Sequence, residues 1–166
     1  DNMGLPFFII FIMADFGSLF GGYISGLLIK NGWTVNKARK ITLLVCAVII
    51  LPVVFVPVVA GKWLAVFLIG LGAAGHQSWS INSYTLVPDV FPKKAVASVI
   101  GIGKMVGVAV AIVADIALGS VLDTANNSGY FWAFIIAGFS YLVILLFVHL
   151  LMPKMTPLDD NLDYVK

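Results

Sequence analysis

The sequence predicts an all-α membrane protein with five transmembrane helices. Of its 166 residues, 61% are hydrophobic and 11% are charged, and the mean hydropathy is +1.05. Soluble domains have roughly 45–50% apolar and about 25% charged residues. Five apolar stretches are each long enough to cross a hydrocarbon core, which takes about 20 helical residues. The expected spans are 5–29, 41–60, 63–87, 95–121 and 130–152, followed by a polar tail, 153–166.

The first span carries one charge, Asp15, about halfway along its length. It also contains glycines at a spacing of four, Gly17 with Gly21 and Gly22 with Gly26. Pairs of small residues at this spacing let a neighbouring helix backbone approach closely. We therefore expect this span to pack tightly, with Asp15 either pairing with a cation or taking part in ion coupling.

The basic residues predict the orientation of the spans. Cytoplasmic connections carry an excess of Lys and Arg when short loops are compared. The loop 30–40, the connection after the third span and the tail would lie on one side, whereas the other side holds only Lys62. The basic side collects Lys30, Lys37, Arg39, Lys40, Lys93, Lys94, Lys154 and Lys166. The sequence thus predicts an external N-terminal end and a cytoplasmic C-terminal tail.

The third span contains a cluster of polar side chains in an otherwise apolar segment. The cluster comprises His76, Gln77, Ser80, Asn82 and Tyr84. Polar groups inside a membrane need a partner or a water-filled cavity, and they often mark a substrate path. Imidazole, carboxamide and hydroxyl groups supply donors and acceptors for a polar ligand. The alternative reading is that these side chains form hydrogen bonds between helices.

The fourth span carries Lys104 and Asp115 on a segment rich in small residues. A cation near mid-membrane costs roughly 2.5–3.5 kcal/mol on insertion scales unless it is paired. Lys104 could meet the carboxylate of a substrate, form an ion pair with Asp15, or extend along the helix towards the interface. Asp115 lies roughly 16 Å from Lys104 along a helix, so these two residues cannot pair.

Several function classes have no support in the sequence. The formal charge of +2 is small and scattered, which argues against nucleic-acid binding. The single Cys46 leaves no internal disulfide, and we expect no metal site. The segment 101–107, GIGKMVG, lacks the strand and the spacing of a phosphate-binding loop. We expect neither an enzyme nor a cofactor.

A family resemblance covers nearly the whole chain to about Pro153. The segment 14–40, ADFGSLFGGYISGLLIKNGWTVNKARK, resembles the eighth helix and following loop of Major Facilitator Superfamily transporters. The segments 75–79 (GHQSW), 89–99 (DVFPKKAVASV) and 101–103 (GIG) resemble the tenth helix, a cytoplasmic loop and the eleventh helix of the anion:cation symporter family. Within that family the likeness is strongest to bacterial hexuronate transporters. The resemblance implies that residues 1–152 correspond to helices eight to twelve, a partial C-terminal six-helix bundle.

The resemblance also implies a function. It suggests a proton-coupled secondary transporter of the cell membrane, in bacteria the inner membrane, which imports a hexuronate or related sugar acid by alternating access. The partners would be the organic anion, the lipid bilayer and the N-terminal half of the same transporter. His76, Gln77 and nearby hydroxyls would hold the sugar, and Lys104 would attract its carboxylate. Hexuronate transporters usually resemble GIGGMAG where this chain has GIGKMVG, which favours a different anion.

Two alternatives remain open from the sequence. One is a carrier of phosphate, a dicarboxylate or an acidic amino acid. The other is a membrane scaffold or sensor that does not transport.

Overall fold

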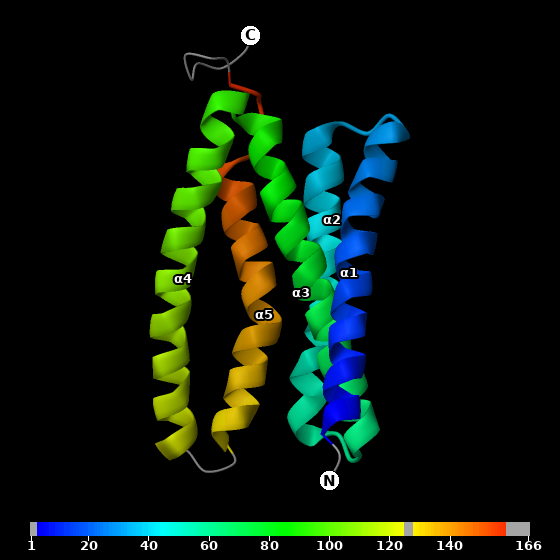
Figure 1. The fold of residues 1–166 in the computed structure, drawn as a ribbon, viewed down its shortest axis with the longest axis vertical. Coiled ribbons are helices and arrows are strands. Elements are labelled where there is room, and N and C mark those ends of the chain that lie inside the picture. Colours follow the sequence, from blue (N-terminus) through cyan, green and yellow to red (C-terminus); the bar gives the residue numbers. More distant parts are fainter. Residues whose placement is uncertain (1–2, 125–127, 159–166) are drawn as a thin grey trace.

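The chain folds into long helices that run up and down beside one another (Figure 1). The computed structural model describes residues 3–124 and 128–158. Five of its helical segments are long and apolar enough to cross a membrane, which confirms the predicted all-α membrane fold. The elements are α1 (Gly4–Lys30), α2 (Val35–Ile50), the 3-10 helix η1 (Leu51–Val58), α3 (Lys62–Val90), α4 (Lys93–Thr124) and α5 (Ser128–Leu151).

Helix α2 begins earlier than the apolar pattern predicts. Its first residue is Val35, and Thr34 caps it by accepting a hydrogen bond at Oγ1 from the backbone N–H of Lys37 at 3.4 Å. Lys37, Arg39 and Lys40, expected in a loop, therefore lie on the first turns of a helix. A Thr cap stabilises a helix start without any apolar signal, so hydropathy alone places this boundary too late.

The prolines act differently in the second and third spans. Where Pro52 follows α2, the chain tightens into η1, with Pro57 inside it. Helix α3 instead continues through Pro88 to Val90, beyond the expected end at residue 87. Proline removes only one backbone donor, and the helix closes with Phe91 N–H bonded to Val87 O at 2.9 Å.

Helices α1 and α3 approach each other closely at two glycines. A Cβ atom at Gly21 would lie 2.7 Å from Ser78 Cα, and one at Gly17 would overlap the backbone of Ala74. The Ser78 hydroxyl donates to Gly17 O, and Asn82 Nδ2 donates to Gly21 O at 2.9 Å. The first predicted glycine pair is thus a packing surface, whereas a Cβ at Gly26, in the second pair, would have open space around it.

The apolar core lies among α2, α3 and α5. Leu43, Cys46 and Ala47 of α2 pack against Trp79 of α3, and all four are buried. Tyr141 of α5 meets the Trp79 ring edge-on, with the ring centroids 5.3 Å apart. Trp79 therefore packs, and the core joins α5 to the α2–α3 pair.

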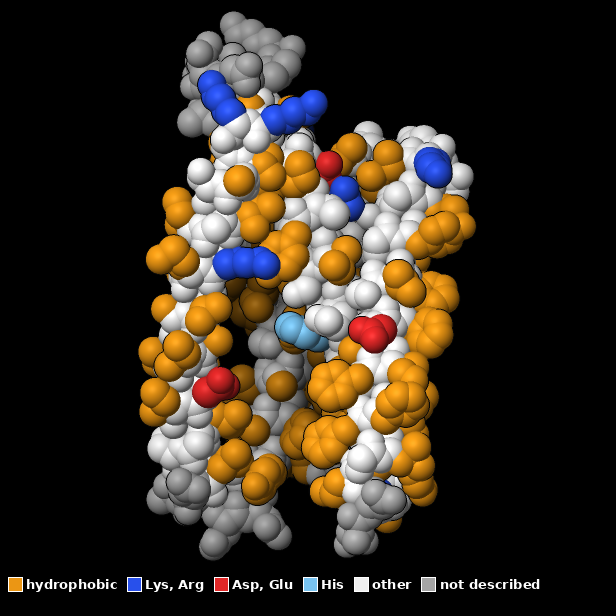
Figure 2. Space-filling model, in the orientation of Figure 1, with side chains coloured by type: hydrophobic (Ala, Val, Ile, Leu, Met, Phe, Trp, Pro, Cys, Tyr) orange, Lys and Arg blue, Asp and Glu red, His pale blue; other side chains and the backbone are white. Residues whose placement is uncertain are grey.

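Most basic residues gather at one end of the bundle, here called the basic end (Figure 2). Near this end an ion pair joins α2 to α3, and a hydrogen bond joins α2 to α1. Arg39 Nε lies 2.8 Å from Asp89 Oδ2, and Arg39 Nη1 donates to Ser25 Oγ at 2.6 Å. The Arg39 side chain is 11% exposed and that of Asp89 is 25% exposed. One guanidinium thus satisfies partners from two other helices.

Helix α4 stands apart from the other helices over most of its length. Every residue from 101 to 120 is exposed, and a Cβ at Gly101, Gly103 or Gly107 would meet nothing within 4 Å. Figure 2 shows the resulting hollow between α4 and the rest of the bundle. At the basic end, Leu158 N–H donates to Val90 O at 2.7 Å, so the chain after α5 returns to the corner between α3 and α4.

Substitution of the tight glycine should destabilise the bundle. Gly21→Ala places a methyl group against Ser78, so we expect a loss of about 1–3 kcal/mol in the free energy of unfolding. Gly26→Ala is the matched control and should be neutral or slightly stabilising, because alanine favours helix by about 1 kcal/mol. Unfolding in detergent micelles measures both, and equal stabilities would contradict the close contact.

The Arg39–Asp89 pair should show energetic coupling. We expect Arg39→Gln and Asp89→Asn each to cost about 1–3 kcal/mol, because each leaves a partly buried charge without its partner. The double variant should cost less than the sum of the two. Unfolding of all four proteins gives the coupling energy, and strict additivity would show that the pair contributes nothing. Lys94→Gln, at an exposed lysine of the same end, is the control.

Candidate functional site

Two polar contacts border the hollow next to α4, one between His76 of α3 and Tyr141 of α5 and the other between Lys104 of α4 and Tyr84 of α3. The candidate site consists of His76 and Tyr84 on α3, Lys104 on α4 and Tyr141 on α5. His76, Tyr84 and Lys104 are exposed, and Tyr141 is half-buried. In Figure 2 a basic side chain and a histidine border this hollow. Three helices thus contribute polar groups to one region of the bundle.

His76 is held by the tyrosine of α5. Its Nδ1 lies 2.5 Å from the Tyr141 hydroxyl, and the two rings meet edge-on with centroids 6.0 Å apart. Tyr141 is in turn fixed against buried Trp79. When the hydroxyl donates to Nδ1, the imidazole proton lies on Nε2, which is then a hydrogen-bond donor. The pair can therefore present an oriented donor to a ligand oxygen.

Lys104 lies over the ring of Tyr84, with Nζ 4.8 Å from the ring centroid. Among the residues that the structure describes, no carboxylate forms an ion pair with it. An exposed cation–π contact contributes about 0.5–1 kcal/mol, less than the roughly 2.5–3.5 kcal/mol cost of a mid-membrane lysine. Tyr84 alone does not offset that cost, which leaves Lys104 able to accept an anionic partner.

The other predicted binding residues of α3 lie differently. Asn82 is fully buried against α1, where Nδ2 donates to Gly21 O and also to Ser78 O at 2.9 Å. Its Oδ1 is buried without a donor in the described part of the chain. Gln77 and Ser80 are half-buried. The amide of Asn82 thus joins helices, the alternative role considered for this cluster.

The ion pair of Asp15 with Lys104, one of the alternatives that the sequence leaves open, is not formed among the described residues. Across residues 3–124 and 128–158 the one ion pair joins Arg39 to Asp89. Asp15 is exposed on α1, and its backbone carbonyl accepts a hydrogen bond from Ser18 Oγ at 2.8 Å. The same residues contain no cluster of three His, Cys, Asp or Glu side chains that could hold a metal ion.

Sequence reasoning did not identify the contact of Tyr141 with His76 or the ion pair of Arg39 with Asp89. Tyr141 stands among apolar residues in the last span, and nothing local indicates its contact with His76, 65 positions away. Arg39 and Asp89 were placed on the same side of the membrane, which is a signal for pairing.

The comparisons with known proteins point to transport. The chain is 26% identical over 121 residues to the hexuronate transporters of Escherichia coli K12 and of Escherichia coli O157:H7. The match covers 72% of this chain but only 28% of each relative. No protein-family model and no solved structure matches the chain. Five helical segments in the described part of the chain are long and apolar enough to cross a membrane, so the chain is a multi-pass membrane protein similar to part of a transporter.

Proposed function

We propose that this chain is the C-terminal part of a proton-coupled secondary transporter of the Major Facilitator Superfamily that imports an organic anion, a hexuronate or related sugar acid. The observation that carries the proposal is Lys104. It is an exposed cation within a span, it lacks a carboxylate among the described residues, and it lies over Tyr84 beside the hollow. The likeness to hexuronate transporters supports an anionic sugar as the partner.

The chemistry of a sugar acid suits the groups of the candidate site. Lys104 provides a charge-assisted donor for the carboxylate, and His76 Nε2 provides a directed donor for a hydroxyl. Gln77, half-buried one residue along α3, can donate and accept. The face of the Tyr84 ring opposite Lys104 would pack against the pyranose. The charged, polar and apolar parts of the ligand would thus each meet a group of matching chemistry.

The exposure of α4 supports the proposal that further helices of the same protein pack against it. Residues 101–120 are exposed, and Cβ atoms at Gly101, Gly103 and Gly107 would meet nothing within 4 Å among the described residues, although small-residue faces serve to pack helices. The relatives extend well beyond the matched region, which is 28% of their length. We therefore place further helices of the same transporter against this face, closing the site and permitting alternating access by rocking of two halves. Sequencing the gene upstream of Asp1 tests this. Codons for further apolar spans would support the transporter, whereas a start codon directly before Asp1 would favour a scaffold.

Transport assays test the site directly. We expect Lys104→Gln to raise the apparent KM for labelled galacturonate by about 10- to 100-fold, the effect of losing a charge-assisted hydrogen bond of about 1.5–3 kcal/mol. His76→Ala should raise it by about tenfold through loss of one directed donor. Uptake by cells expressing the full-length protein, corrected for its amount in the membrane, measures both.

Two controls interpret that assay. Lys104→Arg keeps the charge and should retain most of the affinity, whereas Lys62→Gln removes an exposed charge at the far end of α3 and should leave KM unchanged. Wild-type affinity in both Lys104→Gln and His76→Ala would refute the site. Uptake of labelled phosphate, succinate or glutamate, with none of galacturonate, would move the proposal to another anion.

We also propose that the basic end faces the cytoplasm, following the distribution of Lys and Arg. In intact cells a membrane-impermeant maleimide should then label Lys62→Cys. It should label Lys154→Cys only after permeabilisation. Both positions are exposed and lie at opposite ends of the bundle. The reverse labelling pattern would invert the orientation.

A further inference from the structure

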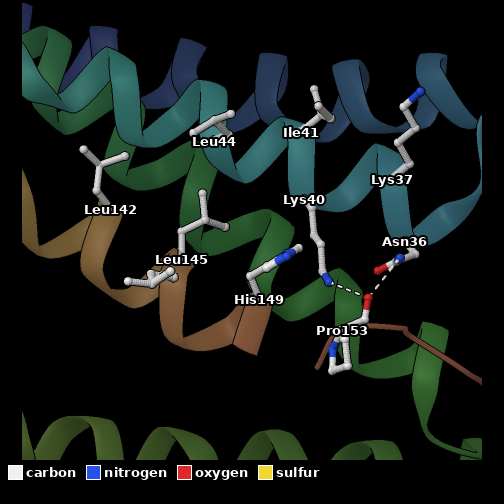
Figure 3. A pocket seen from close by; sticks show the side chains of 10 residues that line it. Asn36, Lys37, Lys40, Ile41, Leu44, Leu142, Leu145, His149 and Pro153 are labelled. Atoms are coloured by element: carbon white, nitrogen blue, oxygen red, sulfur yellow. Dashed lines mark hydrogen bonds between the residues drawn. The ribbon is translucent and has the colours of Figure 1, made fainter. Parts of the chain in front are cut away.

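A groove opens between α2 and α5 near the basic end, apart from the candidate site (Figure 3). Its volume is about 540 Å³. The walls are apolar over most of their length, with Ile41 and Leu44 on α2 facing Leu142 and Leu145 on α5. The segment Val35–Val58, which is α2 with η1, and the segment Gly129–Leu151 of α5 are each long enough to cross a membrane, so the groove would run along a surface in contact with hydrocarbon chains.

The end of this groove towards the basic end is cationic. It is lined by Lys37 and Lys40 of α2 and His149 of α5, and no acidic residue within the described ranges lines it. The Lys37 ammonium lies over the Trp33 ring, 4.6 Å from its centroid. Lys40 Nζ donates to Met152 O at 2.6 Å and to Pro153 O at 2.9 Å, which occupies two of its three N–H groups. Carbonyl groups hold the ammonium in place but do not neutralise it. The groove therefore presents a fixed positive charge at one end of an apolar slot.

We propose that this groove binds an anionic phospholipid. One acyl chain would lie between Leu44, Leu142 and Leu145, and the phosphate would meet Lys37 and Lys40. Basic pockets between membrane helices are suited to acidic headgroups. An apolar helix in the same groove would cover the leucines but leave both lysines without an anion. A phospholipid matches the apolar and the cationic parts at once, which is why we favour it over a protein partner.

The amide of Asn36 indicates which kind of phospholipid headgroup fits the groove. Its Nδ2 donates to Pro153 O at 3.5 Å, while its Oδ1 is buried and has no donor among the described residues. A buried acceptor left without a hydrogen bond is unfavourable. Rotation of the Asn36 side chain towards the groove would bring Oδ1 within reach of a headgroup hydroxyl, so phosphatidylglycerol, which carries a hydroxyl beside the phosphate, fits better than phosphatidic acid. Phosphatidylcholine has no N–H or O–H group to donate and is zwitterionic, so it should bind least.

Photocrosslinking locates the lipid. The purified full-length protein is reconstituted in nanodiscs of phosphatidylcholine with a small fraction of phosphatidylglycerol that carries a diazirine on its acyl chain. We expect crosslinks on peptides that contain Leu44 or Leu142–Leu145, and competition by unlabelled phosphatidylglycerol but not by soluble glycerol phosphate. Equal crosslinking by a phosphatidylcholine probe would overturn the proposal, as would an absence of crosslinks at these positions.

Variants separate charge from general packing. Lys37→Gln with Lys40→Gln should lower crosslinking roughly tenfold or more at limiting lipid. Lys37→Gln alone should lower it less while leaving the Lys40 contacts intact. Lys93→Gln with Lys94→Gln removes the same charge from exposed positions outside the groove and should have no effect. A similar loss in both double variants would show a surface-wide charge effect and refute a site. No transport is measured, so this result is independent of the substrate.

Discussion

The contact between α1 and α3 supports the arrangement of the remaining helices. Two glycines bring the backbones so close that side chains of α3 reach the carbonyl oxygens of α1. In a membrane the hydrophobic effect does not drive helices together, so close packing and interhelical hydrogen bonds must do so. Ser78 and Asn82 provide both at the same place. Trp79 of α3 then packs against α2 and α5, and Arg39 of α2 bonds to Ser25 of α1 and Asp89 of α3.

This geometry divides the polar residues of α3 between two roles. Ser78 and Asn82, four positions apart, share the face that meets α1, because residues at this spacing lie one above the other on a helix. His76 and Tyr84 are exposed and point away from that interface. Polarity in a membrane helix therefore does not by itself indicate a binding residue. The direction of the side chain decides whether it joins helices or remains available to a ligand.

The sequence was sufficient for the spans and for the first glycine pair, because hydropathy and small-residue spacing are local signals. It was insufficient where distant residues decide the outcome. The contact of His76 with Tyr141 and the burial of Asn82 depend on how helices rotate against each other, which a single-helix pattern does not contain. The continuation of α3 through Pro88 was missed for a different reason: proline lowers helix stability but does not prohibit a turn whose remaining hydrogen bonds are made.

The corner between α3 and α4 gives small angular changes a large effect. Only Phe91 and Pro92 separate the two helices, and Leu158 is bonded to the same corner at Val90. Lys104 lies eleven residues into α4, roughly 16 Å from the corner at 1.5 Å per residue. A rotation of about 10° there would displace Lys104 by about 3 Å, enough to separate it from Tyr84, given the same lever length. A rotation at this two-residue connection would therefore move the cation of α4 further than any residue between it and the corner.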